Sequence, residues 1–170
     1  MDLRCYFVTG HLADPRRIVR IAMAAAAGGA GIIQIRSKPI SARDLYKLSS
    51  EVACAVATIN PLTRVLIDDR LDVAIALRSQ NIPIAGVHVG QDDLSPRICR
   101  KLLGAEAIIG LTTGTLELVE KANKQAEYID YIGCGHPNER LWPGSSRTRF
   151  LRRACHPFCG TSGSHRRHYS

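Results

Sequence analysis

The sequence predicts an α/β protein built on parallel strands, and it favours a (β/α) barrel over an open doubly wound sheet. Short apolar strand-like runs alternate strictly with helical segments through residue 135. Nearly every expected strand ends in polar residues, as strands do on the carboxyl-terminal face of a barrel. No G-x-G-x-x-G follows the first strand, which weakens a dinucleotide-binding fold. At 170 residues, the chain is long enough for one domain with a substantial core.

Six strands and five intervening helices are expected in chain order. Pro15 suits the first turn of the first helix, Gly28 suits its end, and Ser41 suits the N-cap of the second helix. The strict alternation implies right-handed crossovers between parallel strands. The strands are expected at 4–9, 31–36, 64–68, 86–90, 107–112 and 130–135, and the helices at 14–28, 41–59, 70–80, 93–104 and 115–126.

The chain changes character after Gly135. Residues 136–170 hold seven arginines, no lysine and one acid, so most of the net charge of +8 lies there. We therefore expect an incomplete barrel domain at 1–135 and a basic, disordered or out-of-frame tail at 136–170. Such a tail can bind phosphate backbones non-specifically. Without interleaved aromatics or a known module, we expect no specific nucleic-acid partner.

Composition places the protein among soluble cytoplasmic proteins. The Ala-rich stretch at 21–33 is interrupted by glycines, so no membrane association is expected. The first residues are expected to enter a strand at once, without a leader. The six cysteines are far apart, which makes a disulfide framework improbable. The first four lie in apolar runs, as buried free thiols do: Cys5, Cys54, Cys99 and Cys134.

Polar residues at four successive strand ends suit a phosphorylated ligand. Gln34, Arg36 and Lys38 are spaced two apart and point to one side of their strand. The two basic residues supply charge and donors for phosphate oxygens. Asp69 and Asp93 follow neighbouring strands, and two carboxylates there could hold a hard cation such as Mg²⁺. A cation beside a basic pair stabilises a departing diphosphate.

Each feature also has a purely structural interpretation. Asp68 or Asp69, and Asp92 or Asp93, could be helix N-caps, and Arg36 and Lys38 could be solvated. His88 is expected to be a hydrogen-bonded core histidine rather than a metal ligand. Capping could also explain three threonines: Thr112, Thr113 and Thr115.

The motifs "IIQIRSK", "DDRLDVAIAL", "GVHVGQDDL", "IGLTTGTLELV" and "DYIGCG" resemble the thiamine phosphate synthase family, in this order, over residues 5–135. The resemblance implies a (β/α)₈ TIM barrel that joins hydroxymethylpyrimidine diphosphate to thiazole phosphate with Mg²⁺ and releases diphosphate. It implies a dissociative reaction with no separate catalytic acid or base. The implied metal ligands are Asp69 and Asp93, and the implied substrate-binding residues are Gln34, Arg36, Lys38, Asp68 and Thr112.

Two residues depart from the family pattern. Asp68 stands where many members have Asn, so its role in contacting the diphosphate is open. Gly114 stands where many members have His; a thiazole tautomerase of the same fold would need a histidine near there, which argues for the synthase. Two alternatives to the synthase function are kept: the tautomerase, and a non-catalytic remnant with a basic tail.

The tail is a third departure, because the family continues from "GCG" into a P-T-x-x-K loop and two further strands. Read one base later, a back-translation of "HPNERLWP" admits T-P-T-N-A-S-G-P, so we hypothesise a reading-frame shift near Gly135, with truncation as the alternative. Six strands of eight would leave two open parallel edges. We therefore expect poor folding or aggregation and little or no synthase activity; self-association into a defined oligomer is left open.

Overall fold

Six parallel strands alternate with five α-helices in the computed structural model, which describes residues 1–10, 14–134 and 149–152. A 3₁₀ helix, η1, lies at Ala126–Tyr128 before the sixth strand. The alternation matches the predicted elements, whose ends differ by up to three residues. The strands are β1 (Tyr6–Val8), β2 (Ile32–Ile35), β3 (Arg64–Asp68), β4 (Ile84–Val89), β5 (Ile108–Thr113) and β6 (Tyr131–Cys134), and the helices are α1 (Pro15–Ala27), α2 (Ala42–Ile59), α3 (Leu71–Ser79), α4 (Pro96–Leu103) and α5 (Leu116–Asn123).

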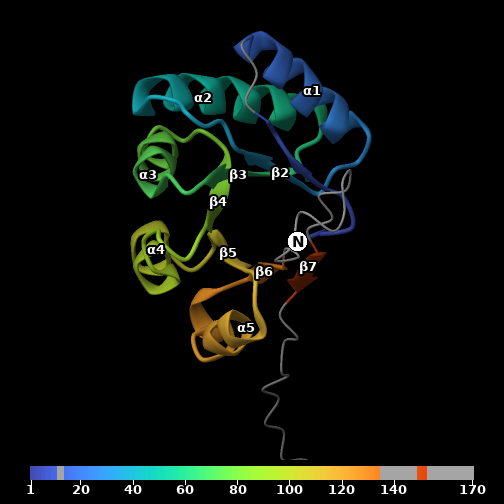
Figure 1. Ribbon diagram of the computed structural model, residues 1–170. Coiled ribbons are helices and arrows are strands. Elements are labelled where there is room, and N and C mark those ends of the chain that lie inside the picture. The colour runs from blue at the N-terminus through green and yellow to red at the C-terminus, as the bar shows by residue number, and fades with distance from the viewer. Residues whose placement is uncertain (11–13, 135–148, 153–170) are drawn as a thin grey trace, which may run out of the picture.

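The strands follow one another in sequence order, each parallel to the next from β1 to β6. The strands form an arc with the helices along its outside (Figure 1). A doubly wound sheet would instead reverse its strand order and carry helices on both faces. The described residues therefore form a half-barrel.

Side-chain caps begin three of the helices. Asp14 accepts a hydrogen bond from Arg16 N (2.9 Å) with Pro15 in the first turn of α1, and Ser41 accepts one from Asp44 N (3.1 Å) at α2. Thr115 caps α5 through Leu118 N at 3.3 Å. These bonds satisfy backbone N–H groups that a first helical turn leaves without partners. The predictions for Ser41 and for the capping role of Thr115 are confirmed.

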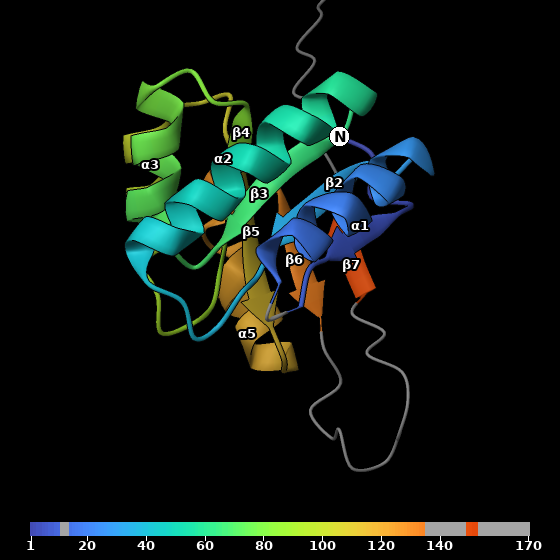
Figure 2. The same ribbon diagram turned by 90° about the horizontal axis from the view of Figure 1, so that it is seen from above.

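The core has two parts because successive strand residues point to opposite faces of the sheet. The larger part fills the space between strands and helices and includes Ile33 and Ile35 of β2. Figure 2 shows α1 and α2 side by side over this part of the sheet. The smaller apolar cluster comprises Ile32, Leu66 and Tyr131. Buried polar residues of the strands also lie among the described residues: Gln34, Asp68, His88 and Thr113.

The sheet has a seventh strand, β7 (Arg149–Arg152), which runs antiparallel to β6 and pairs with all four of its residues. The expectation of two open parallel edges is therefore wrong at β6, because these four tail residues pair with its outer edge. The remaining residues of the predicted tail lie outside the described part of the chain.

The cysteine prediction needs one correction. Cys5, Cys54, Cys99 and Cys134 are free thiols, as expected, but only Cys99 is buried and Cys134 is half-buried. Cys5 precedes β1, and Cys54 lies on the exposed side of α2. An apolar run on an amphipathic helix still includes outward positions. Among the described helices, none is both long and apolar enough to cross a membrane.

Candidate active site

Three predicted site residues of the β2 segment converge on Asp68 at the end of β3. Gln34 Nε2 donates a hydrogen bond to Asp68 Oδ1. Arg36 Nε lies 3.4 Å and Lys38 Nζ 3.8 Å from Asp68 Oδ2. The prediction that these side chains point to one side is confirmed, because alternate residues of the strand and its exit share a face.

Asp68 is a buried carboxylate with both acidic and basic neighbours. It is 8% exposed. Burial, followed by the neighbouring Asp69, raises the pKa of Asp68 to about 6, while Lys38, Gln34 and Arg36 act in the opposite direction. Desolvation therefore outweighs the three favourable contacts.

Asp69 and Asp93 form the acidic part of the site. Asp69 has a φ of 57°, which Asp tolerates better than most residues, and its N–H donates to His88 O at 2.8 Å. Its carboxylate forms an ion pair with Lys38. Asp93 Oδ2 accepts a hydrogen bond from Gly90 N at 2.7 Å. Burial raises the pKa of Asp93, and the adjacent Asp69 carboxylate raises it further.

None of the three carboxylates of the site caps a helix. Arg70 is the N-cap residue of α3 and Ser95 that of α4, and neither of these positions makes a side-chain capping bond. The capping interpretation is therefore wrong for Asp68, Asp69 and Asp93.

The two carboxylates suit a hard cation. Ionised carboxylates at neighbouring strand ends repel each other unless a proton or a cation lies with them. Among the described residues, no group of three or more His, Cys, Asp or Glu side chains could hold a metal ion. A pair of carboxylates fits Mg²⁺, which takes one or two of them and completes its coordination with water and phosphate oxygens.

Thr112 joins the site through His88. Thr112 Oγ1 lies 2.8 Å from His88 Nε2, and Thr112 O accepts from Gln91 Nε2 at 2.6 Å. His88 is 6% exposed, and burial lowers its pKa to about 4. The interpretation of His88 as a hydrogen-bonded core histidine is therefore confirmed. No direct contact links Thr112 to the two carboxylates in the part of the chain described here.

The sequence analysis missed two tyrosines that extend this connection. His88 Nδ1 lies 2.8 Å from the hydroxyl of Tyr131, which lies 2.7 Å from that of Tyr6. The Tyr6 hydroxyl donates to Gln34 Oε1 at 2.7 Å. Gly110 pairs with His88 on one side and with Tyr131 on the other. A glycine between polar strand residues was the available signal, because a Cβ there would collide with both rings.

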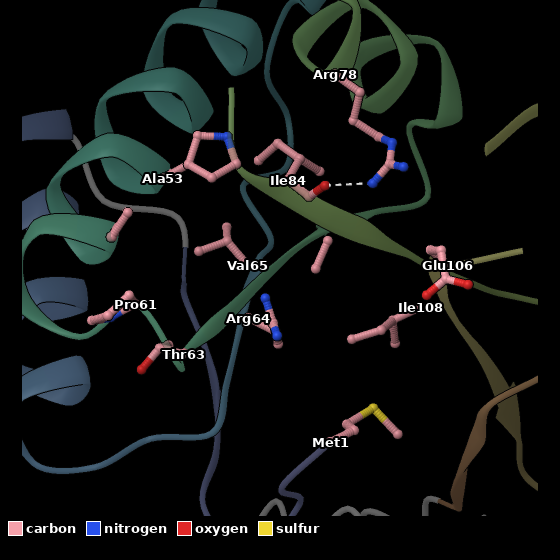
Figure 3. A pocket seen from close by; sticks show the side chains of 13 residues that line it. Met1, Ala53, Pro61, Thr63, Arg64, Val65, Arg78, Ile84, Glu106 and Ile108 are labelled. Atoms are coloured by element: carbon pink, nitrogen blue, oxygen red, sulfur yellow. Dashed lines mark hydrogen bonds between the residues drawn. The ribbon is translucent and has the colours of Figure 1, made fainter. Parts of the chain in front are cut away.

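Two cavities lie at opposite ends of the strands. One, of about 350 Å³, is lined by Ser37, Lys38, Asp68 and Arg70 and adjoins the predicted site. The other, of about 620 Å³, lies where β3, β4 and β5 begin, with Arg64 and Ile108 on its wall (Figure 3). Its size does not make it the site, because barrels bind and react substrates at the carboxyl ends of their strands.

The fold and the site define a class of α/β proteins with a parallel half-barrel and with basic and acidic groups at the carboxyl ends of its strands. The chain belongs to the thiamine monophosphate synthase family, whose model matches residues 5–140.

Curated relatives agree with this assignment. The chain is 64% identical over 135 residues to a thiamine-phosphate synthase of Corynebacterium jeikeium. The aligned region covers 79% of this chain and 61% of the relative. It is 60% identical over 134 residues to that of Corynebacterium efficiens, covering 79% and 60%. The chain therefore spans about three fifths of the length of these relatives.

Solved structures support the fold. A thiamine phosphate pyrophosphorylase from Pyrococcus furiosus matches with a TM-score of 0.63 and 26% identity, over 85% of this chain and 64% of that one. A putative dihydrodipicolinate synthetase from Pseudomonas aeruginosa matches with a TM-score of 0.60 at 12% identity, over 78% and 47%, and shows the fold alone.

Proposed function

We propose that this chain carries the diphosphate-binding half of a thiamine phosphate synthase. The enzyme would join hydroxymethylpyrimidine diphosphate to thiazole phosphate and release diphosphate. The observation that carries the proposal is the convergence of Gln34, Arg36 and Lys38 on the acidic residues at the end of β3, in a member of this family.

Arg36 and Lys38 are the proposed phosphate contacts. Their side chains are 55% and 54% exposed, so their charged ends are accessible from solvent although both lie close to Asp68. Asp69 holds Lys38 and, by that hydrogen bond, raises its pKa, so Lys38 is cationic at neutral pH. A cationic side chain beside an exposed guanidinium suits the oxygens of a diphosphate.

Asp69 and Asp93 are the proposed ligands of Mg²⁺. When bound, the cation supplies positive charge against the diphosphate and screens the repulsion between the two carboxylates. Asp68 stays outside this ligand pair, since Gln34, Arg36 and Lys38 already surround its carboxylate.

The protein groups then act by position and charge. We propose that diphosphate leaves first, a pyrimidine-methyl cation forms, and the thiazole nitrogen captures it. Arg36 and Lys38 favour departure by neutralising charge that grows on the leaving group. Gln34 orients the pyrimidine diphosphate, and Thr112 lies beside this ligand. No described residue is assigned a separate acid or base role.

The whole enzyme is proposed to be a closed (β/α)₈ barrel acting in the cytoplasm, with small molecules as its partners. Two more parallel strands would be needed beyond the six here. In barrels, phosphate sites often follow strands seven and eight. The second substrate, thiazole phosphate, is therefore expected to bind groups outside the described half-barrel.

Calorimetric titration of the 170-residue chain with pyrophosphate tests the proposal directly. We expect binding that requires Mg²⁺ and that weakens at least about tenfold in Arg36→Ala, because a charge-assisted contact is lost. Arg43→Ala, an exposed arginine on α2, is the control and should bind normally. Binding that ignores both Mg²⁺ and Arg36 would refute the proposal. Turnover with both substrates, followed as diphosphate release, should be low or absent for this chain alone.

A further inference from the structure

An uninterrupted chain of hydrogen bonds crosses the inside of the half-barrel and links two of the proposed substrate-binding residues. Four of its five heavy-atom distances are 2.7 or 2.8 Å, and the fifth bond joins Gln34 to Asp68. Six strand positions, one from each of the six parallel strands, are tied together in this way. The interior chain consists of Thr112, His88, Tyr131, Tyr6, Gln34 and Asp68.

The direction of the interior chain is set at Gln34. The amide nitrogen of Gln34 donates to a carboxylate oxygen of Asp68, so the side-chain amide has one orientation. The amide oxygen of Gln34 then faces Tyr6, and an amide oxygen also only accepts. The proton of the Tyr6 hydroxyl is therefore directed to Gln34.

The next two bonds follow by proton accounting. A phenol carries one proton, and that of Tyr6 is committed to Gln34, so Tyr131 must donate to Tyr6. The single proton of Tyr131 is thereby committed as well. The bond between Tyr131 and His88 consequently needs a proton on Nδ1 of the histidine.

The last bond follows from the neutral state of His88. The ring is buried, and its two nitrogens contact only hydroxyl groups in these hydrogen bonds, which favours the uncharged imidazole. A neutral ring protonated at Nδ1 has an accepting Nε2. Thr112 therefore donates its hydroxyl proton to His88, and every donor in the interior chain points from Thr112 toward Asp68.

We propose that Tyr6, Tyr131 and His88 are positioning residues that hold Gln34 and Thr112 in single orientations, with His88 as the Nδ1–H tautomer. The effect of these three residues on substrate binding rests on the proposed function. The tautomer of His88 is inferred from the hydrogen bonds alone and does not depend on that function. Gln34 keeps one amide N–H for a ligand. Thr112 offers a ligand only an acceptor, so its partner is a donor such as a water or an amino group rather than a phosphate oxygen.

Nitrogen-15 NMR of the His88 ring tests the proposal without substrate. The full chain is labelled at histidine, and the spectrum is recorded at pH 8, in solution or by magic-angle spinning of precipitated protein. The His88→Asn variant identifies the signals of His88. We expect a protonated Nδ1 and an unprotonated Nε2. A ring protonated at Nε2, or an averaged mixture of tautomers, would overturn the proposal.

Tyr6→Phe tests whether the direction is transmitted along the interior chain. The substituted side chain is two hydrogen bonds away from His88 along the interior chain, and the variant removes the acceptor of the Tyr131 proton. Tyr131 then becomes able to donate to Nδ1. We expect the Nε2–H tautomer to become the major form. Tyr46→Phe on α2 is the matched control and should leave the spectrum unchanged. Equal spectra for wild type and Tyr6→Phe would refute the coupling.

Pyrophosphate binding separates this proposal from the proposed function. If wild type shows the Nδ1–H tautomer but binds no pyrophosphate with Mg²⁺, the proposed direction of the hydrogen bonds is supported and the proposed function is refuted. If both hold, Tyr6→Phe should weaken binding of hydroxymethylpyrimidine diphosphate by roughly threefold to tenfold, since Gln34 loses one of its two anchors. Unchanged affinity would remove the positioning role.

Discussion

At the scale of single residues, Asp68 shows how position outweighs residue type. A carboxylate with Gln34, Arg36 and Lys38 around it would be expected to have a low pKa. Its pKa is instead raised to about 6, because its burial costs more than these contacts return. An asparagine at this position would keep the accepting oxygen for Gln34 without the buried charge.

The Asp68→Asn variant should be more resistant to heat at pH 8. The folded pKa of Asp68, about 6, lies above the ordinary value of 3.8. Its ionised form therefore weakens the fold above pH 6, and this penalty disappears as pH falls toward 4. We expect a gain of roughly 2 kcal/mol at pH 8, after allowing for the lost ion pairs. The check is the temperature at which half of the protein becomes insoluble, measured at both pH values. An equal gain at pH 4 would contradict the explanation.

The carboxylate pair makes a second prediction at this scale. Asp93→Asn should weaken Mg²⁺ binding at least about tenfold, because a hard cation loses one of its two charged ligands. Asp69→Asn should do the same and should also release Lys38. The matched control is Asp92→Asn, an exposed neighbour of the same charge, which should bind Mg²⁺ as wild type does. Calorimetry without substrate gives the comparison, and equal losses for Asp92 and Asp93 would contradict the assignment.

At the scale of elements, the ends of the strands carry the site residues, and a glycine in β5 leaves space for two buried rings beside it. Gly110 lies between His88 of β4 and Tyr131 of β6 in the strand register. A side chain there would occupy the space where the two rings meet. Close packing of this kind rejects even one added methyl group, because protein interiors have little free volume.

Gly110→Ala should therefore separate His88 from Tyr131. We expect destabilisation of roughly 1–3 kcal/mol, typical of overpacking, together with loss of the single His88 tautomer. Gly114→Ala is the control four residues later, where a Cβ meets nothing within 4 Å. Heat-induced insolubility and the histidine NMR spectrum report the two effects. A tolerated Gly110→Ala with an intact tautomer would show that the rings have room to move.

At the scale of the whole molecule, the edges of the sheet limit stability. Among the described residues, β1 pairs with a strand on one side only, and its Val8 is 40% exposed. The edge of β6 is paired with β7, so the described sheet has one parallel edge where two were expected. An unpaired edge with an apolar side chain is a template for association with another chain.

Val8→Lys should slow aggregation of the isolated chain. A charge on an edge strand opposes strand pairing between molecules. Leu62→Lys is the control, because Leu62 is 78% exposed but lies in the turn before β3. Light scattering during incubation at several concentrations measures the rate. Equal slowing by both variants would point to general solubility rather than to the β1 edge.

The sequence alone determined the order of the strands and helices and the strand ends that carry chemistry. Apolar periodicity and capping residues are local signals, so Ser41 and the run at 64–68 could be placed without neighbours. Only the tertiary structure decided that Asp68 is buried beside Gln34, that Tyr6 and Tyr131 continue the contacts of His88, and that β7 pairs with β6. These contacts depend on the register of strands that are far apart in the sequence. No local sequence pattern shows which side chains that register brings together.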